Sequence, residues 1–187
     1  MLGDVMWKVL HLLLIAILAM FPTLSVEGQE VDNPKPFEES FPDLGYTTVE
    51  EAVGAFEEYY GRSVTLPLRV PPIEFTHQFG RFKNGEENQL GHSLEITFLN
   101  EELLINHYKI DIRPLEEKIP IENKETLGKY SLNYGNEAKY IAIAGFNVFV
   151  FEKEGWQYMI SIDRRITELI TPDNLVDIAN SIDYAQQ

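Results

Sequence analysis

The spacing of apolar residues between positions 73 and 163 restricts this chain to a fold that contains a sheet. Apolar and polar side chains alternate in segments 73–79, 94–98 and 108–112, which is typical of strands with one buried face. Further short strands are predicted around 128–134, 138–144, 147–152 and 156–163. Short turns separate most of these segments, so we predict a curved, mostly antiparallel sheet of about six to seven strands.

Two amphipathic helices are predicted at the ends of this region. Thr48 is a favourable N-cap residue, Glu51 completes a capping box, and the apolar residues that follow recur at helical spacing. A second helix is predicted over 172–183, with Thr171 as its N-cap and Pro172 in its first turn. We therefore predict one α+β domain over 46–187, with an N-terminal and a C-terminal helix packed on one face of the sheet.

Residues 1–28 have the pattern of an export signal. Lys8 precedes an uncharged, mostly apolar run over 9–26, and Gly28 is a small residue at a suitable cleavage position. The alternative is an uncleaved anchor, because a run of this length can just span a bilayer. Both versions keep Lys8 inside and the domain outside, so we predict a secreted or extracytoplasmic protein. Any membrane contact would come only from this segment.

Residues 29–45 are predicted to form an acidic, Pro-rich linker. The segment contains three prolines and five acidic residues, which disfavour a helix and favour solvation. Phe37, Phe41 and Leu44 could attach this linker loosely to the domain.

The charge and the lack of cysteine exclude several functional classes. The chain has 30 acidic and 15 basic residues, giving a net charge of −15, and no cysteine. An acidic surface repels nucleic acid, so no nucleic-acid partner is predicted. Without cysteine there are no disulfides, thiolate nucleophiles or cysteine-based zinc sites. No cofactor is predicted, and the composition fits a bacterial secreted protein.

The motif that most resembles a catalytic site is Gly91-His92-Ser93-Leu94-Glu95. It resembles the nucleophile elbow of α/β-hydrolases, but Glu95 replaces the final glycine. In an elbow the serine sits on a turn from strand to helix, whereas Ser93 is predicted to begin a strand. No catalytic residue is therefore predicted.

A metal site is not predicted from the histidines or the acidic doublets. Three histidine ligands would have to converge within about 2 Å of one ion. The alternation instead places His77 on the core side of the sheet and His107 on the other side, with His92 near a hairpin end. Glu86 and Glu87 at the predicted hairpin tip could hold a cation weakly, and this is the single cation site that we consider.

Aromatic residues in the second half of the chain allow two interpretations. Tyr134, Tyr140 and Trp156 could form an exposed surface that binds a glycan or a peptide. They could equally be core residues and cross-strand pairs. Trp156 lies beside a predicted turn and is expected to be the most exposed of the three.

Three stretches between Thr48 and Ile182 form a pattern: the helix start at 48–52 with the Pro-rich segment 66–71, the hairpin over 148–160, and the ending 175–182. With these stretches the region resembles an uncharacterised family of exported domains from Bacillus-type bacteria. Relatives often lie behind a membrane segment or in anti-sigma-factor-like regulators of envelope stress. The resemblance implies a fold and supplies no catalytic residue.

The sequence leaves three functional classes open. The first is a non-catalytic binding or accessory domain of the bacterial cell envelope, whose ligand would be an envelope protein, a peptide or a lipid. The second is a secreted hydrolase that uses carboxylates, and the third is a structural or spore/envelope assembly protein. An exposed apolar groove would favour binding, and an acidic pair with a raised pKa in a cleft would favour an enzyme.

Overall fold

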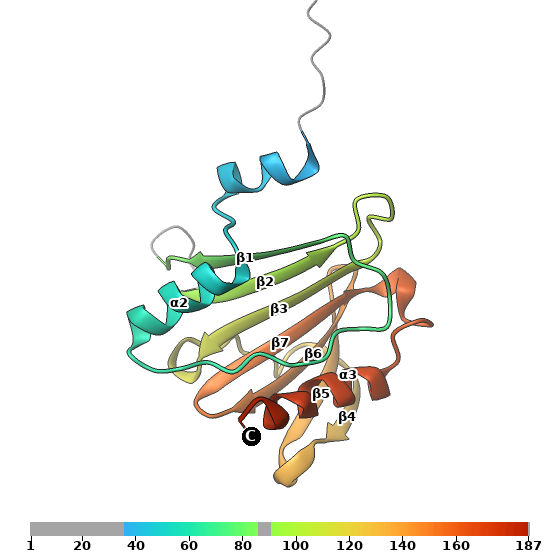
Figure 1. Cartoon of the computed structure of the whole chain (residues 1–187). Helices are drawn as coiled ribbons and strands as arrows, with labels where there is room; N and C mark the ends of the chain where they lie inside the picture. Colours follow the sequence, from blue (N-terminus) through green and yellow to red (C-terminus); the bar gives the residue numbers. More distant parts are fainter. Residues whose placement is uncertain (1–35, 86–90, 187) are drawn as a thin grey trace, which may run out of the picture. The chain divides into compact units, whose positions relative to one another are not determined.

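Seven antiparallel strands form one open sheet in the order β1-β2-β3-β7-β6-β5-β4 (Figure 1). The computed structural model describes residues 36–85 and 91–186. The strands are β1 (His77–Lys83), β2 (Ser93–Leu99), β3 (His107–Pro114), β4 (Glu125–Ser131), β5 (Glu137–Ile143), β6 (Phe146–Lys153) and β7 (Trp156–Asp163). The predicted antiparallel sheet is thus confirmed, and β1 and β4 are its two edges.

The sheet consists of two meanders that meet at its centre. Strands β1 to β3 form the first and β4 to β7 the second, and β3 pairs with β7 from Tyr108↔Ile162 to Pro114↔Trp156. The chain therefore leaves β3 in the middle of the sheet and begins β4 at the far edge. The connection over 115–124 has to pass three strands.

Two tight turns fix the register of the second meander. Ala144 and Gly145 join β5 to β6 with φ values of 43° and 90°, and Glu154 and Gly155 join β6 to β7 with φ values of 52° and 83°. Two-residue hairpin loops with positive φ at both positions match the twist of the strands they connect. A glycine at the second position lowers the cost of this backbone conformation.

The two predicted helices are present with their predicted caps. Helix α2 spans Val49–Tyr60 with a capping box between Thr48 and Glu51, and α3 spans Pro172–Asn180 with Thr171 as its N-cap. The second helix was expected to reach residue 183, but it continues after Asn180 as a 3-10 helix. The 3-10 helices are η1 (Phe37–Ser40), η2 (Pro42–Leu44), η3 (Leu115–Glu117), η4 (Asn133–Gly135), η5 (Arg164–Ile166) and η6 (Ser181–Gln186).

A large apolar core lies against one face of the sheet, which we call the core face. Phe56 from α2 and Ile178 from α3 belong to the same buried cluster as Ile110, Phe149 and Ile160 from the strands. Complete burial of each such side chain contributes about 1.5–3 kcal/mol. The free energy of folding therefore comes mainly from this face.

The opposite side of the same strands, the second face, carries a smaller apolar cluster. Its buried members are Ile141, Val148, Val150 and Met159. These residues alternate along their strands with core-face residues, as the pleat requires. In the part of the chain that the structure describes, this cluster packs against Ile119, Ile121, Ile143 and Phe146 and not against α2 or α3.

The N-terminal segment of the described chain packs onto β1. The rings of Phe41 and Phe79 stack with centroids 4.1 Å apart, and Thr47 forms a bridge with Gly80. A side chain at Gly80 would place a Cβ 2.6 Å from the Cβ of Ala52, so glycine allows α2 to lie close to the strand. Phe41 thus attaches this segment to β1, whereas Leu44 is exposed.

The predicted orientation of His77 is wrong. The ring lies 5.2 Å from Phe37 and 5.9 Å from Phe79, on the side away from Phe82, which packs against the core. The strand begins at His77 rather than at residue 73. Phe75 packs against the core but lies before the strand, in irregular backbone. Its side therefore does not predict the side of His77.

Within the described residues, no helix has both the length and the apolar character needed to cross a membrane. The predicted export segment, 1–28, lies outside these residues.

Candidate functional site

A cavity of about 430 Å³ opens on the second face, over the adjacent strands β3, β7 and β6. This volume is within the range of small-molecule sites. The apolar lining consists of Ile119, Ile143, Ala144, Phe146, Val148 and Met159, and the polar lining of Lys83, His107, Lys109, Asp111, Arg113, Lys124 and Ser161. An apolar floor beside a group of charged side chains is the typical composition of a ligand site.

The strand register explains why the two kinds of lining lie side by side. Lys109 on β3 is opposite Ser161 on β7, which is opposite Val148 on β6. Asp111 is opposite Met159. Most of the charged side chains thus come from β3, and most of the apolar ones from β6 and the β5–β6 turn before it.

The cavity is rich in cations although the chain is acidic. Lys83, Lys109, Arg113 and Lys124 are four of the 15 basic residues of the chain, whereas Asp111 is the single lining residue among its 30 acidic ones. Low-dielectric walls strengthen the potential of such a group. The described part of the cavity therefore has a local charge opposite to that of the whole chain.

Glu95 on β2 holds three cations beside the cavity. Its side chain is 2% exposed, and its carboxylate lies 3.0 Å from Arg81 Nη2, 3.2 Å from Lys109 Nζ, and in contact with Lys83 Nζ. The hydroxyl of Tyr46 donates to it as well. Burial raises the pKa of Glu95, but Lys109, Lys83 and Tyr46 outweigh this effect and lower the pKa to about 2. The carboxylate is therefore ionised at neutral pH.

A second buried pair lies next to this group. Arg113 Nε donates to Asp111 Oδ1 over 2.7 Å, and its Nη2 donates to Ser93 Oγ over 3.3 Å. Ser93 is fully buried, and its neighbour His92 points instead to Glu117 and the ring of Tyr59. The hydrolase-like motif therefore has no exposed serine, in agreement with the prediction that Ser93 begins a strand.

His107 lines the cavity on the second face, as its position in the strand pattern predicts. Burial lowers the pKa of the imidazole, and Lys109 lowers it further. The ring is therefore neutral at neutral pH. It adds a hydrogen-bonding group but no charge to the cavity wall.

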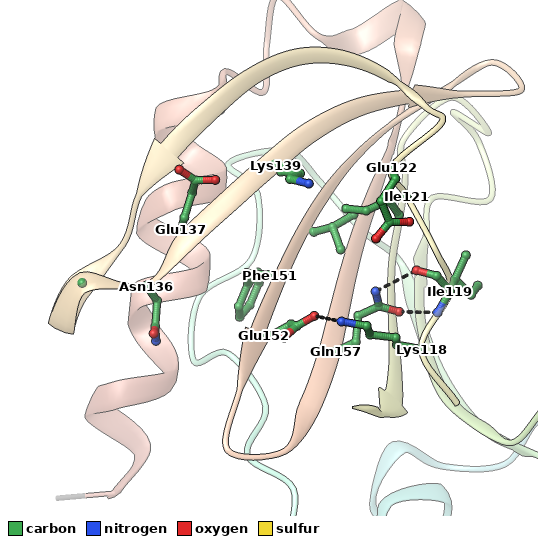
Figure 2. A pocket seen from close by; sticks show the side chains of 12 residues that line it. Lys118, Ile119, Ile121, Glu122, Asn136, Glu137, Lys139, Phe151, Glu152 and Gln157 are labelled. Atoms are coloured by element: carbon green, nitrogen blue, oxygen red, sulfur yellow. Dashed lines mark hydrogen bonds and ion pairs between the residues drawn. The ribbon is translucent and has the colours of Figure 1, made fainter. Parts of the chain in front are cut away.

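The connection over 115–124 crosses the second face of the sheet. Ile119 N donates to Gln157 Oε1 over 2.8 Å, and Gln157 Nε2 donates back to Ile119 O over 3.0 Å (Figure 2). Ile119 and Ile121 also pack against the small apolar cluster. A buried glutamine on β7 thus fastens this segment across the strands.

A second hollow of about 400 Å³ lies on the other side of this connection. Figure 2 shows its charged side chains, among them Glu122, Glu137 and Lys139, and the 2.8 Å ion pair of Lys118 with Glu152. Ile119 lines both spaces. The second hollow has charges of both signs, so it is a weaker candidate for a selective ligand site.

The predicted exposed aromatic surface is wrong for Trp156 and Tyr140, which are 1% and 5% exposed. Trp156 Nε1 donates to Ser63 O over 3.1 Å, and the Tyr140 hydroxyl accepts from Asn147 Nδ2 over 2.9 Å. Both residues face the core, as Tyr158 does on β7 and Ala138 on β5. The side chain of Tyr134 and the predicted weak cation site at Glu86 and Glu87 lie outside the described residues.

One group of possible metal ligands occurs in the described part of the chain, and it is not the three-histidine set. Ligand atoms of Glu38, His77 and Glu101 lie within 4.8 Å of one another. Both carboxylates are on exposed residues, and His77 Nδ1 already contacts Thr76 Oγ1 at 2.7 Å. We assign no metal site to this group, because exposed acidic residues often lie this close without an ion.

No protein-family model, curated protein or solved structure matches this chain. The resemblance to exported Bacillus-type domains therefore stays a prediction. The geometry of the second face is the basis for a functional assignment.

Proposed function

We propose that this protein is a non-catalytic extracytoplasmic binding domain of the bacterial cell envelope, and that the cavity on the second face is its ligand site. The observation that carries this proposal is the apolar floor of Val148, Met159 and Phe146 beside four cationic side chains. Apolar side chains such as Val148 and Met159 stabilise a fold mainly when they are closely packed. An open cavity beside buried charges lowers the stability of the fold, so a ligand that fills the cavity explains it better.

The placement of the helices supports this proposal. We infer that α2 and α3 both cover the core face, because Phe56 and Ile178 belong to one cluster with core-face strand residues. Neither helix contributes a residue to the cluster on the second face. Among the described residues, the second face is covered by the N-terminal segment and the 115–124 connection rather than by these helices, and the cavity opens beside that connection.

The carboxylates around the cavity favour binding over hydrolysis. A carboxylate-dependent hydrolase needs one group that stays protonated near neutral pH. Glu95 has a pKa of about 2, and Asp111 is bonded to the guanidinium of Arg113. Neither carboxyl group is suited to act as a general acid.

An extracytoplasmic location rests on the export pattern of residues 1–28. We propose that the domain acts outside the cytoplasm as an accessory component, either released by cleavage after Gly28 or held by the apolar segment. A purely structural or assembly role is less well supported, because it gives no reason for a cation-lined cavity.

Titration with anilinonaphthalene sulfonate tests the ligand site. The full chain is expressed with its own leader, and the purified product is titrated while probe fluorescence is recorded. Ser161→Phe fills the cavity from β7 and is expected to weaken binding at least tenfold. Asn136→Phe adds a ring to the second hollow from an exposed position and is expected to leave binding unchanged.

Circular dichroism melts show whether both variants remain folded. Equal binding by wild type and Ser161→Phe, with both folded, would contradict the assignment of the cavity. Loss of binding only in Asn136→Phe would move the site to the second hollow.

A further inference from the structure

We propose that the cavity binds a single-chain anionic amphiphile, with its alkyl chain on the apolar floor and its carboxylate or phosphate head at Lys109 and Lys124. This inference rests on the proposed ligand site and specifies the class of ligand. It follows from the shape of the cavity, the sign of its charge and the free donors of its lysines.

The cavity separates an apolar part from a cationic part. Val148 and Lys109 lie on strands separated by β7, so their backbones are roughly 10 Å apart at about 4.8 Å per strand. Phe146 and Ile143 extend the apolar part towards the β5–β6 turn. A ligand that contacts both parts has to be elongated, with one polar end.

The lysines retain donors for an anionic head group. An ammonium group has three N–H donors, and within the described ranges 36–85 and 91–186 Lys109 forms one ion pair, with Glu95 at 3.2 Å. The side chain of Lys109 remains 32% exposed. Glu95 is thus a positioning residue: it fixes the ammonium group but leaves donors directed elsewhere.

Lys124 supplies a second, less constrained charge. It lies on the connection that crosses the second face, is exposed, and forms no ion pair within residues 36–85 and 91–186. A flexible lysine at the cavity rim can follow a head group without disturbing the sheet.

The charge of the cavity selects against neutral and cationic ligands. Asp111 is the acidic lining residue, and its carboxylate is bonded to Arg113 over 2.7 Å. A cationic head would meet Lys83, Lys109 and Lys124 without a free counter-charge among the described residues. An anionic head gains charge-assisted hydrogen bonds, which are stronger than neutral ones.

Competition against anilinonaphthalene sulfonate with ten-carbon probes tests the head group. Decanoate, decanol, decyltrimethylammonium and inorganic phosphate are each added below any micelle-forming concentration. Decanoate is expected to compete at least tenfold better than decanol, decyltrimethylammonium still less well than decanol, and phosphate alone not at all. Dodecanoate should bind more tightly than decanoate, by about fourfold per methylene, the equivalent of roughly 0.8 kcal/mol.

Lysine variants locate the head group. Lys124→Met and Lys109→Met keep most of the apolar stem, and each is expected to weaken decanoate binding at least fivefold while decanol binding changes less than twofold. Lys129→Met is the matched control, because Lys129 lies on β4 and pairs with Glu137 outside the cavity. Lys109→Met removes an ion-pair partner of the buried Glu95 and could therefore unfold the protein. In that case Lys124→Met alone tests the head-group site.

The outcomes separate this inference from the proposed function. Equal binding of decanol and decanoate, or no effect of Lys124→Met, would overturn the anionic head group while the cavity remained a ligand site. Stronger competition by an apolar tetrapeptide with a free carboxyl terminus would overturn the single-chain assignment. No binding of any probe, including anilinonaphthalene sulfonate, would overturn the ligand site itself.

Discussion

The two faces of the sheet come from the same strands but bury different chemistry. On the core face the buried strand residues are apolar with the exception of Asn147, which pairs with Tyr140. On the second face the buried polar strand residues are Ser93, Glu95, Thr97, Asp111, Arg113, Gln157 and Asp163. The alternation of a strand therefore separates stabilising residues from charged ones within a single sequence.

This difference has an energetic consequence. Burial of charge is costly unless the charges are paired, and even a paired buried ion adds little stability compared with apolar packing. The second face satisfies its charges with the Asp111–Arg113 pair and the cations around Glu95. Such an arrangement keeps charges fixed in place, which a binding site requires and a core does not.

The largest expected effect comes from disrupting the core face. Phe56→Ala removes a fully buried ring that lies 4.9 Å from Trp156. We expect a loss of about 3–5 kcal/mol in the free energy of unfolding, because the truncation leaves a cavity between α2 and β7. Urea denaturation measures this loss. Tyr59→Ala on the exposed side of α2 is the control and should cost less than about 1 kcal/mol. Equal losses in the two variants would show that the core face does not carry most of the stability.

A smaller effect, dependent on pH, is expected on the second face from Glu95→Gln. A folded-state pKa lowered from 4.5 to about 2 corresponds to roughly 3 kcal/mol of stability at pH 7. Because the folded pKa is below the unfolded one, this contribution is complete above about pH 5 and is lost as the pH falls towards 2. The wild type and the variant should therefore differ at pH 7 and converge near pH 2.

Urea denaturation of both proteins at intervals between pH 2 and pH 7 measures this convergence. Other carboxylates, such as Asp163, also change the stability with pH. Their contribution cancels when the free energy of unfolding of one protein is subtracted from that of the other. A constant difference across this range would show that Glu95 acts through its shape and not through its charge.

The smallest expected effect comes from Tyr46→Phe, which affects the link between the N-terminal segment and the second face. The pKa of Tyr46 is raised to about 12 by burial and by its hydrogen bond to Glu95, so the hydroxyl stays a donor at neutral pH. Its removal is expected to cost about 1.5 kcal/mol, the lower end of the range for hydrogen bonds to charged groups, because Glu95 keeps its three cationic partners. Chemical denaturation at pH 7 measures it, with Tyr59→Phe as the control. A loss below that of the control would contradict a stabilising role for this link.

The local elements of the fold could be predicted from the sequence because their signals lie within a few residues. The capping box of Thr48 and Glu51 marks the start of α2, and Thr171 with Pro172 marks the start of α3. Alternation identified the strands, and it placed His107 away from the core. It failed for His77 because irregular backbone at Phe75 interrupts the strand pattern.

The site could not be predicted because its residues meet only through strand order. Lys83, Lys109 and Lys124 come from β1, β3 and the connection after β3. The sequence shows that Lys109 and Asp111 share a face, but it does not show that β7 lies beside them. Trp156 was expected to be the most exposed of the three aromatic residues because it lies next to a turn. Its position in the sequence does not reveal which neighbouring strand covers it.

The pairing of β3 with β7 also determines when this protein can fold. Strand β7 is the last strand to be synthesised, yet it lies at the centre of the sheet and joins the two meanders. Phe56 near the start of the described chain needs Trp156 near its end as a packing partner. Contacts this distant in sequence form slowly, because a long loop has to close first. A growing chain therefore lacks its central strand until residue 163 has been made, and the two meanders cannot pair before that point.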